Sequence, residues 1–436
     1  MQTTLSSIAS FLLHRCTRTT LIVVSAAGLL AAGLTGCGTG LSVVTKANTA
    51  AATGTTSSDG TATSSGTSSG SSEGGSTGAG GATGSTGSNE ATTTAGSSNS
   101  TTVSVGATQQ AAVRWVTNFG DSITAGWGSS APQFAYASLL DTAIASPNEN
   151  WSRAGDQAAD MARLWVYPNA TPSRGSSQLY TVLIGTNDAN SCGGSDGCIA
   201  NWRQSLAASL AWLAVPASDK VLGNSIAQQT GGQQSGEWTP DLTNGIATSA
   251  AGASLSFNVR QAVSGRSLLV AYRVFDAGAG GGAATVSIDG VPVTTLSAAV
   301  TTGQAIDTKN GTTDTIFLAT IPLGEEGEHI VTLTTTTAGF FSLQWAGVSS
   351  GNYAQTAGAP RVLIGQITST GSAALNLIVN QYNVQLQQLI AALAGEGLNI
   401  QIVPTANVLQ PGDFTDELHP NDAGHLVLAQ TFAASL

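Results

Sequence analysis

Short apolar segments alternate with helix-like patterns in two separate parts of the chain, 111–218 and 355–436. The segments with strand-like composition are 112–119, 180–184, 361–367 and 399–403. Hydrophobic residues recur at helical spacing over 134–145, 199–213 and 373–394, the last of which is followed by Gly395. Strands that alternate with helices predict an α/β fold, in which helices cover both faces of a parallel sheet.

Between these two parts, residues 219–354 show a different pattern. Strand-like segments follow one another with Gly-rich turns between them, and no helical pattern interrupts the series. These segments are 255–263, 267–275, 284–288, 291–296, 315–323, 329–336 and 340–348. Asp289-Gly290 is a strong signal for a hairpin turn between two of them. We therefore expect an all-β, jelly-roll-like sandwich inserted into one α/β domain built from 111–218 and 355–436.

Residues 1–36 have the pattern of an export signal. His14, Arg15 and Arg18 form a basic start without acidic residues, and the apolar run 20–34 follows it. A membrane span needs about 20 residues, so this shorter run suits the hydrophobic part of a signal peptide. Leu34-Thr35-Gly36-Cys37 resembles a bacterial lipobox, which predicts a lipoprotein signal peptide and lipidation of Cys37. A signal with an incidental cysteine and an uncleaved anchor helix are the alternatives.

Residues 37–110 are predicted to form a disordered tether. Within them, residues 51–100 contain 26 Ser or Thr, 12 Gly, 7 Ala and no aromatic residue. Such a segment cannot bury enough apolar surface to offset the entropy lost on ordering. We expect an exported protein, lipid-anchored to the bacterial cell envelope at the outer membrane or cell surface, that contacts the membrane through its anchor only.

The charged residues narrow the range of partners and of chemistry. The chain has 25 acidic and 14 basic residues and a net charge of −11. Phosphate binding needs clustered Lys and Arg, which the sequence lacks, so no nucleic-acid partner is expected.

Of the four histidines, His14 lies in the export signal. His329 lies at a predicted solvated turn and His425 in the final helical pattern, which leaves His419 as the expected base.

Two short motifs carry candidate catalytic groups. Gly120-Asp121-Ser122 follows a predicted strand, where a parallel sheet presents its active edge, although Thr124 breaks the pattern Gly-x-Ser-x-Gly. Asp416 precedes His419 by three residues, a spacing at which the carboxylate reaches the imidazole and selects its tautomer. A serine hydroxyl is a weak nucleophile and needs such a base. The alternative role for Ser122 is that of a helix N-cap.

These motifs resemble those of the SGNH (GDSL) hydrolases, a family of serine esterases and lipases. Four motifs stand in the order of the family, Gly120-Asp121-Ser122-Ile123, Asn150 to Asp156, Gly185-Thr186-Asn187-Asp188 and Asp416 to His419. The resemblance implies a three-layer α/β/α sandwich around a five-stranded parallel sheet, as in flavodoxin-like folds. It implies Ser122 as nucleophile, His419 as base and Asp416 as its partner. It also implies an oxyanion hole from the N–H groups of Ser122 and Gly155 and the side chain of Asn187, with no cofactor and no metal.

The resemblance leaves some roles and the substrate open. A positive φ at Gly155 and a loop cap at Asn187 are structural alternatives to the oxyanion roles. The context Arg153-Ala154 departs from the second motif of the family. The long β insertion is a further departure, and it leaves the substrate undetermined.

Two cysteines near the third motif predict a disulfide. Cys192 and Cys198 flank Gly-Gly-Ser-Asp-Gly in a chain that is expected to be exported, so a local disulfide just after Asn187 is the preferred interpretation. A structural zinc is not expected, because the pair has no matching His or Cys set. Nucleotides are not implied either, because no Gly-rich phosphate loop follows a strand.

The inserted region looks like the carbohydrate-binding jelly rolls that accompany some carbohydrate esterases. Its aromatic residues fall mostly at strand spacing, which is typical of a core, but Trp238 has a loop-like context suited to contact with a sugar ring. We expect an exported serine esterase that hydrolyses short-acyl carboxylic esters, with acetylated polysaccharide as a candidate substrate. The alternatives are an O-acyltransferase that acts on a cell-envelope or extracellular glycan with the same three residues, and a carbohydrate-binding surface lipoprotein.

Overall fold

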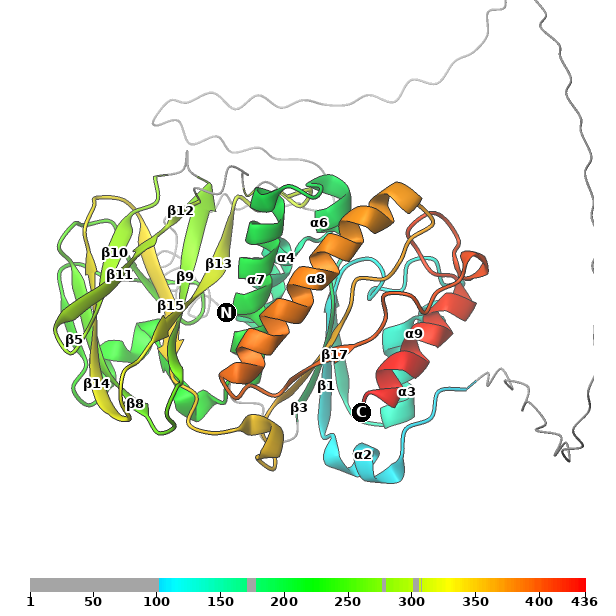
Figure 1. Cartoon of the computed structure of the whole chain (residues 1–436), viewed down its shortest axis with the longest axis horizontal. Coiled ribbons are helices and arrows are strands. Elements are labelled where there is room, and N and C mark those ends of the chain that lie inside the picture. The colour runs from blue at the N-terminus through cyan, green and yellow to red at the C-terminus, as the bar shows by residue number, and fades with distance from the viewer. Residues whose placement is uncertain (1–101, 171–177, 277–279, 301–305, 307) are drawn as a thin grey trace, which may run out of the picture. The chain divides into compact units, whose positions relative to one another are not determined.

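A parallel sheet forms the centre of the α/β domain, the name used below for residues 111–218 and 355–436 (Figure 1). Its strands are β1 (Trp115–Gly120), β2 (Asn148–Ser152), β3 (Gln178–Leu183), β16 (Arg361–Gly365) and β17 (Ile400–Val403). They lie in the order β17-β16-β3-β1-β2, and every neighbouring pair is parallel. Counted along the domain this is the order 2-1-3-4-5 of flavodoxin-like sheets. The predicted α/β class is confirmed.

The computed structural model describes residues 102–170, 178–276, 280–300, 306 and 308–436. These residues lie in one compact unit, Thr92–Leu436. The predicted signal peptide 1–36, the candidate lipidation site Cys37 and tether residues 38–101 lie outside the described residues. Helix α2 (Ala107–Ala112) begins within the segment that the sequence predicts to be tether, and Val103 and Val105 before it pack against the core of the α/β domain.

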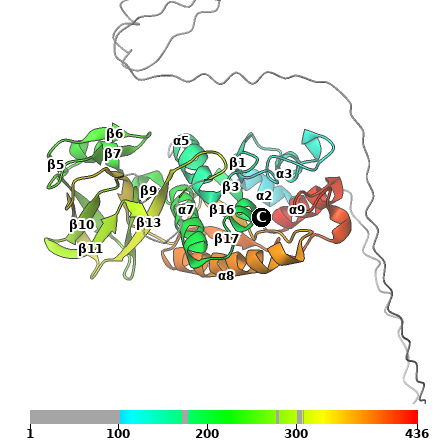
Figure 2. The ribbon, with the colours of Figure 1, turned by 90° about the horizontal axis from the view of Figure 1, so that it is seen from above.

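Helices cover both faces of the parallel sheet (Figure 2). Helices α3 (Tyr136–Ile144) and α9 (Asp422–Ala434) pack on one face, and α7 (Asp196–Ala214) and α8 (Ala373–Gly395) pack on the other. Successive strand side chains point to opposite faces. Leu179 therefore packs with α3 and α9, whereas Tyr180 and Val182 pack with α7 and α8. None of the helices in the described ranges has the length and apolar composition of a membrane span.

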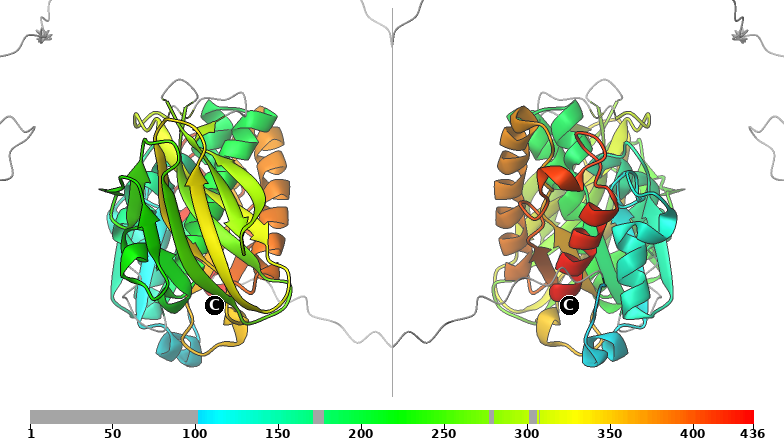
Figure 3. Two further views of the ribbon diagram at one scale, coloured as in Figure 1. Left: turned by 90° about the vertical axis from the view of Figure 1, so that its left-hand side faces the viewer. Right: turned by 90° about the vertical axis from the view of Figure 1, so that its right-hand side faces the viewer.

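The inserted β module, the name used below for residues 219–354, consists of two packed sheets (Figure 3). Its strands are β4 (Lys220–Leu222), β5 (Gln233–Ser235), β6 (Thr239–Asp241), β7 (Gly245–Thr248), β8 (Ser254–Gln261), β9 (Ser267–Asp276), β10 (Ala283–Ile288), β11 (Val291–Ser297), β12 (Ala299–Val300), β13 (Asp314–Pro322), β14 (Gly327–Thr335) and β15 (Phe341–Gly347). One sheet has the order β11-β10-β14-β8-β5. The other contains β12-β9-β15-β7-β6, with β13 on β9 and β4 on β15. The predicted all-β sandwich is confirmed.

The hairpin predicted at Asp289-Gly290 joins β10 to β11, which pair antiparallel. Both turn residues have positive φ, 52° at Asp289 and 80° at Gly290, as a two-residue hairpin turn requires. The pairing of β12 with β9 is parallel, so the sandwich departs from a purely antiparallel one at this short strand.

The β module packs directly on helix α7, which lies between it and the parallel sheet (Figure 1). Trp345 of β15 is fully buried, and its Nε1–H donates to the Tyr167 hydroxyl at 2.9 Å. Its ring centroid lies 6.1 Å from that of Trp212 on α7. One continuous hydrophobic core includes residues of the α/β domain and of strands β9, β13 and β15. The module and the α/β domain therefore share one core within the unit.

Shorter helical segments connect these elements. They are α4 (Ala158–Asp160), α5 (Tyr167–Asn169), α6 (Thr186–Ser191), η1 (Pro132–Phe134), η2 (Met161–Val166), η3 (Ala217–Asp219), η4 (Gly223–Gln228), η6 (Tyr353–Gln355) and η7 (Pro411–Asp413). Segments α4, η2 and α5 follow one another without a break, and η2 is wound as a π-helix. This continuous segment leads from the second motif towards the β module.

Candidate active site

The predicted site residues gather where the parallel strands end. Ser122 follows β1, Gly155 follows β2, and Asn187 follows β3 at the start of α6. His419 lies in the connection between β17 and α9. The carboxyl ends of parallel strands meet at one edge of a sheet, which is where α/β proteins place their sites.

Ser122, His419 and Asp416 form a continuous chain of hydrogen bonds. The Nε2 atom of His419 lies 3.0 Å from Ser122 Oγ, and its Nδ1 atom lies 2.7 Å from Asp416 Oδ2. The other Asp416 oxygen accepts the backbone N–H groups of Leu418 and His419, both at 2.7 Å. Partial burial opposes ionisation of Asp416, but the hydrogen bonds from His419 and from the backbone outweigh it and hold the pKa of this carboxyl below its usual value.

Ser122 is presented by a tight turn and does not cap a helix. Residues 122–128 form consecutive turns after β1. Gly120 is required at the strand end, because a Cβ there would overlap Thr124 Oγ1 and the Leu183 carbonyl oxygen. The fully buried Asp121 accepts the Ile123 N–H at 3.0 Å, and burial raises the pKa of Asp121 to about 7.

Within the described residues, each of the three candidate oxyanion donors keeps one N–H hydrogen without an acceptor. Gly155 has φ = +86°, which only glycine adopts easily. Asn187 donates one amide hydrogen from Nδ2 to the Asp156 carbonyl oxygen at 2.9 Å, so its second amide hydrogen remains for another acceptor. Across the described ranges, nothing accepts a hydrogen bond from the N–H groups of Ser122 and Gly155.

Buried carboxylates hold the segment that carries Gly155. Asp188 accepts the Ala158 N–H at 3.1 Å, and its pKa is raised to about 8, mainly by burial. The Asp156 carboxylate accepts the Trp165 indole N–H at 2.5 Å. Burial and the nearby Asp160 raise the pKa of Asp156 to about 7. In the part of the chain that the structure describes, no group of three or more His, Cys, Asp or Glu is arranged to hold a metal ion.

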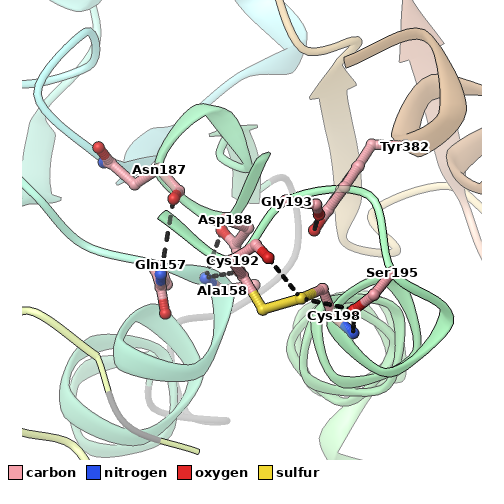
Figure 4. Close-up of a disulfide and its surroundings, with 9 residues drawn as sticks. All are labelled: Gln157, Ala158, Asn187, Asp188, Cys192, Gly193, Ser195, Cys198 and Tyr382. Carbon is pink, nitrogen blue, oxygen red and sulfur yellow. Dashed lines mark hydrogen bonds between the residues drawn. A yellow bond between two sulfur atoms is a disulfide. The ribbon is translucent and has the colours of Figure 1, made fainter. Parts of the chain in front are cut away.

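The predicted disulfide between Cys192 and Cys198 is confirmed (Figure 4). It joins the residue after α6 to the first turn of α7, with a Cα–Cα distance of 5.7 Å. The Tyr382 hydroxyl of α8 donates to the Gly193 carbonyl oxygen at 2.8 Å within the same loop. The loop that follows Asn187 is therefore tied both to α7 and to α8.

The structure reveals Trp127 as a site residue that the sequence analysis missed. The residue is 56% exposed, and the centroid of its ring lies 5.6 Å from that of His419. Its carbonyl oxygen lies 3.0 Å from Nε2 of the buried His425, and burial lowers the pKa of this histidine. His425 is thus a packing residue that fixes the Trp127 turn. The only sequence signal was a tryptophan between two glycines, five residues after Ser122.

Two other residues singled out in the sequence lie away from this site. Trp238 is half-buried against the sandwich core, and its indole N–H donates to the Ser235 carbonyl oxygen at 3.0 Å. His329 pairs with Asp289 at the β10–β11 hairpin, with 2.8 Å between Nδ1 and Oδ2. Neither residue contacts the Ser122 site.

The part of the α/β domain that precedes the β module matches the model of a known family. Residues 119–214, which include Ser122, Gly155 and Asn187, match the model of the GDSL-like lipase/acylhydrolase family. No curated protein matches the chain. A solved member of the lipolytic protein G-D-S-L family from Veillonella parvula DSM 2008 is 14% identical, with a TM-score of 0.34, and the similarity covers 73% of this chain and 96% of that one.

Two further solved structures are similar to parts of the chain. A two-domain esterase active on acetylated mannans is 12% identical, with a TM-score of 0.30, over 55% of this chain and 92% of that one. The carbohydrate-binding module CBM36 in complex with calcium and xylotriose is 16% identical, with a TM-score of 0.22, over 29% of this chain and 95% of that one.

Proposed function

We propose that this chain, which carries a GDSL-like lipase/acylhydrolase domain and is a hydrolase of ester bonds, uses Ser122 as its nucleophile. The observation that supports this role is the chain of contacts from Ser122 Oγ through His419 to Asp416, at 3.0 and 2.7 Å. A hydroxyl within hydrogen-bond distance of an imidazole that is itself oriented by a carboxylate is the arrangement that activates a serine.

In the proposed reaction, Ser122 Oγ forms a bond to the ester carbonyl carbon while its proton moves to His419 Nε2. The carbonyl electron pair becomes an oxyanion. When the intermediate collapses, the bond to the alcohol oxygen breaks and His419 returns the proton to that oxygen. Water then attacks the acyl-serine by the same route, which releases the acid and restores Ser122. Asp416 stays ionised throughout and stabilises the imidazolium.

The oxyanion is proposed to be bound by the N–H groups of Ser122 and Gly155 and by the second amide hydrogen of Asn187. Asn187 is held before substrate arrives by its bond to the Asp156 carbonyl oxygen, and Gly155 adopts a positive φ that glycine tolerates without strain. Donors that need no reorganisation contribute most to this kind of catalysis.

We infer that the substrate is a short-acyl ester of an exported or surface glycan, with acetylated polysaccharide as the preferred class. The exposed indole of Trp127 beside His419 offers a flat apolar face on which a sugar ring can stack. The site opens at the surface, as the 17% exposure of the His419 side chain indicates. An open rim beside the nucleophile suits a polymer better than a buried tunnel would.

The comparison of Ser122→Ala with the unaltered protein tests the mechanism. We expect hydrolysis of a chromogenic acetate to fall to near background in Ser122→Ala, while Ser138→Ala on α3 keeps the full rate. Equal rates for Ser122→Ala and the unaltered protein would contradict the serine mechanism. A panel of acetylated glycans and lipid esters then tests the substrate. Faster turnover of lipid esters would contradict the glycan proposal, and transfer of acetyl to an added sugar would indicate an O-acyltransferase.

We further propose export and lipid anchoring through residues 1–36 and Cys37. The basic start, the apolar run and the lipobox-like residues before Cys37 support this location. Labelling with a fatty-acid analogue in a bacterial host tests it. The label and the membrane association should both be lost in Cys37→Ala, and retention of both would contradict the proposed anchor.

A further inference from the structure

A loop of the β module, residues 308–312, contacts the segment 155–160 that carries Gly155. Thr308 and Thr312 both donate from their hydroxyl groups to Asp160 Oδ1, at 2.6 and 2.5 Å. All three residues are buried. The second oxygen of Asp160 accepts the Gln157 N–H at 3.0 Å, which caps α4. Two hydroxyl groups of the module therefore complete the hydrogen bonding of a carboxylate that shapes this segment.

A third residue of the same loop reaches closer to the candidate oxyanion hole. Asn310 donates from Nδ2 to Oδ1 of Asp156, a residue that is completely buried. The carbonyl oxygen of the same Asp156 accepts the amide of Asn187. Asn310 Nδ2 also lies 3.9 Å from the position that a Cβ on Gly155 would occupy. Asp156 thus links this module residue to both candidate donors.

The base of the loop is fixed to the α/β domain. Asp314, the first residue of β13, pairs with Arg163 of η2 at 2.8 Å, and both side chains are largely buried. The next residue, Thr315, donates to the Ala159 carbonyl oxygen at 3.3 Å. The loop is consequently held in one place relative to the segment 155–160.

We propose that the loop 308–312 belongs to the esterase site and positions the oxyanion donors. This inference rests on the proposed function. Asn310, Thr308 and Thr312 are positioning residues, because they act through Asp156 and Asp160 and do not touch the reacting atoms. The β module then has a role in the chemical step, in addition to any contact with a glycan.

The expected effect is on the rate of the chemical step. A displacement of about 1 Å in a catalytic group costs up to about 100-fold in rate. In Asn310→Asp the amide donor is replaced by a carboxylate of the same size. The pKa of Asp156 is raised to about 7, so at an assay pH of about 8 two carboxylates would face each other and the loop and the segment should separate. We expect kcat to fall at least about 10-fold with KM changed less than about 2-fold, because the donors act mainly on the transition state.

The experiment compares three variants by steady-state kinetics with a chromogenic acetate and by hydrogen exchange of the 153–160 amides. Asn310→Asp should lower kcat and speed exchange. Asn310→Gln keeps the amide donor, so its kcat and the exchange rates of its 153–160 amides should stay close to those of the unaltered protein. Asn258→Asp makes the same chemical change on an exposed position of β8 and should alter neither.

Two results separate this proposal from the proposed function. A normal kcat for Asn310→Asp, with Ser122→Ala inactive, would overturn the positioning role and leave the serine mechanism intact. A lower kcat with unchanged exchange of 153–160 would also overturn it, because the effect would not pass through that segment. Full activity of Ser122→Ala would overturn the serine mechanism and the positioning role together.

Discussion

Replacement of Asp416 by asparagine and by alanine separates two functions of this carboxylate. In Asp416→Asn, the side chain would keep an oxygen for the N–H groups of Leu418 and His419, which Asp416 Oδ1 accepts at 2.7 Å. The new amide nitrogen, however, would donate to Nδ1 of His419. The imidazole would then carry its proton on Nε2, the atom that faces Ser122, and could not accept the serine proton. The change Asp416→Ala would leave Nδ1 to water and permit both tautomers.

The magnitude follows from the exposure of the carboxylate. A wrong tautomer at a buried carboxylate of this kind costs about 10⁴-fold in kcat. The Asp416 side chain is 56% exposed, so solvent weakens its support of the imidazolium and water can replace part of its role. We expect kcat to fall about 10³-fold in Asp416→Asn, about 4 kcal/mol of activation free energy, and about 10²-fold in Asp416→Ala.

Steady-state hydrolysis of a chromogenic acetate by the folded variants shows whether kcat falls further in Asp416→Asn than in Asp416→Ala. Near-ultraviolet circular dichroism establishes that both variants keep the tertiary structure. An asparagine variant that is more active than the alanine variant would refute the tautomer argument. If both variants kept the activity of the unaltered protein, Asp416 would have no part in the reaction.

Three further outcomes are expected. Asn187→Ala should lower kcat about 10²–10³-fold with little change in KM, because it removes one oxyanion donor. Tyr167→Phe leaves the buried Trp345 indole N–H without its acceptor and should lower the free energy of unfolding in urea by about 1–3 kcal/mol. A double-mutant cycle with Trp345→Phe should give an interaction free energy of about 1 kcal/mol. Burial raises the pKa values of four aspartates to about 7 or 8; these are Asp121, Asp141, Asp156 and Asp188. The folded protein therefore holds these protons more tightly than the unfolded chain does, and this contribution to stability is lost as the pH rises towards 7 or 8. The melting temperature should therefore fall by several degrees from pH 5 to 7, although the lowered pKa of His425 acts in the opposite direction. The fall should be less steep in Asp188→Asn. A melting temperature that rises over this range would contradict the raised pKa values of the aspartates.

Elements with strong periodicity were predictable from sequence. The pattern at 373–394 corresponds to α8 (Ala373–Gly395), and the strand-like segments of the β module match β8 to β11 and β13 to β15 within a few residues. Strand β2 was missed because Asn148–Ser152 is polar and partly exposed, so no alternation marks it. The shorter strands β4 to β7 were missed because three or four residues are too few to show a period.

The chemistry of the site was more predictable than its surroundings. The spacing of Asp416 and His419 identified a pair that the structure brings to Ser122. No local pattern relates Asn310 to Asp156, because 154 residues separate them and only the docking of two sheets on α7 brings them together. The aromatic residues of the β module were expected to be mostly core residues, and the fully buried Trp345 lies in the core that the module shares with α7.

The place of the β module within the chain sets the order in which the site can assemble. Strand β3 cannot pair with its neighbour β16 until the whole module has been synthesised, because β16 follows the module in the chain. Pairing between segments so distant in sequence is slow, because the intervening loop has to close first. Ser122, Gly155 and Asn187 precede the module and Asp416 and His419 follow it, so a growing chain lacks part of the candidate site until the segment after the module has been made. The candidate site therefore forms only after the two parts of the α/β domain, on either side of the insertion, have paired.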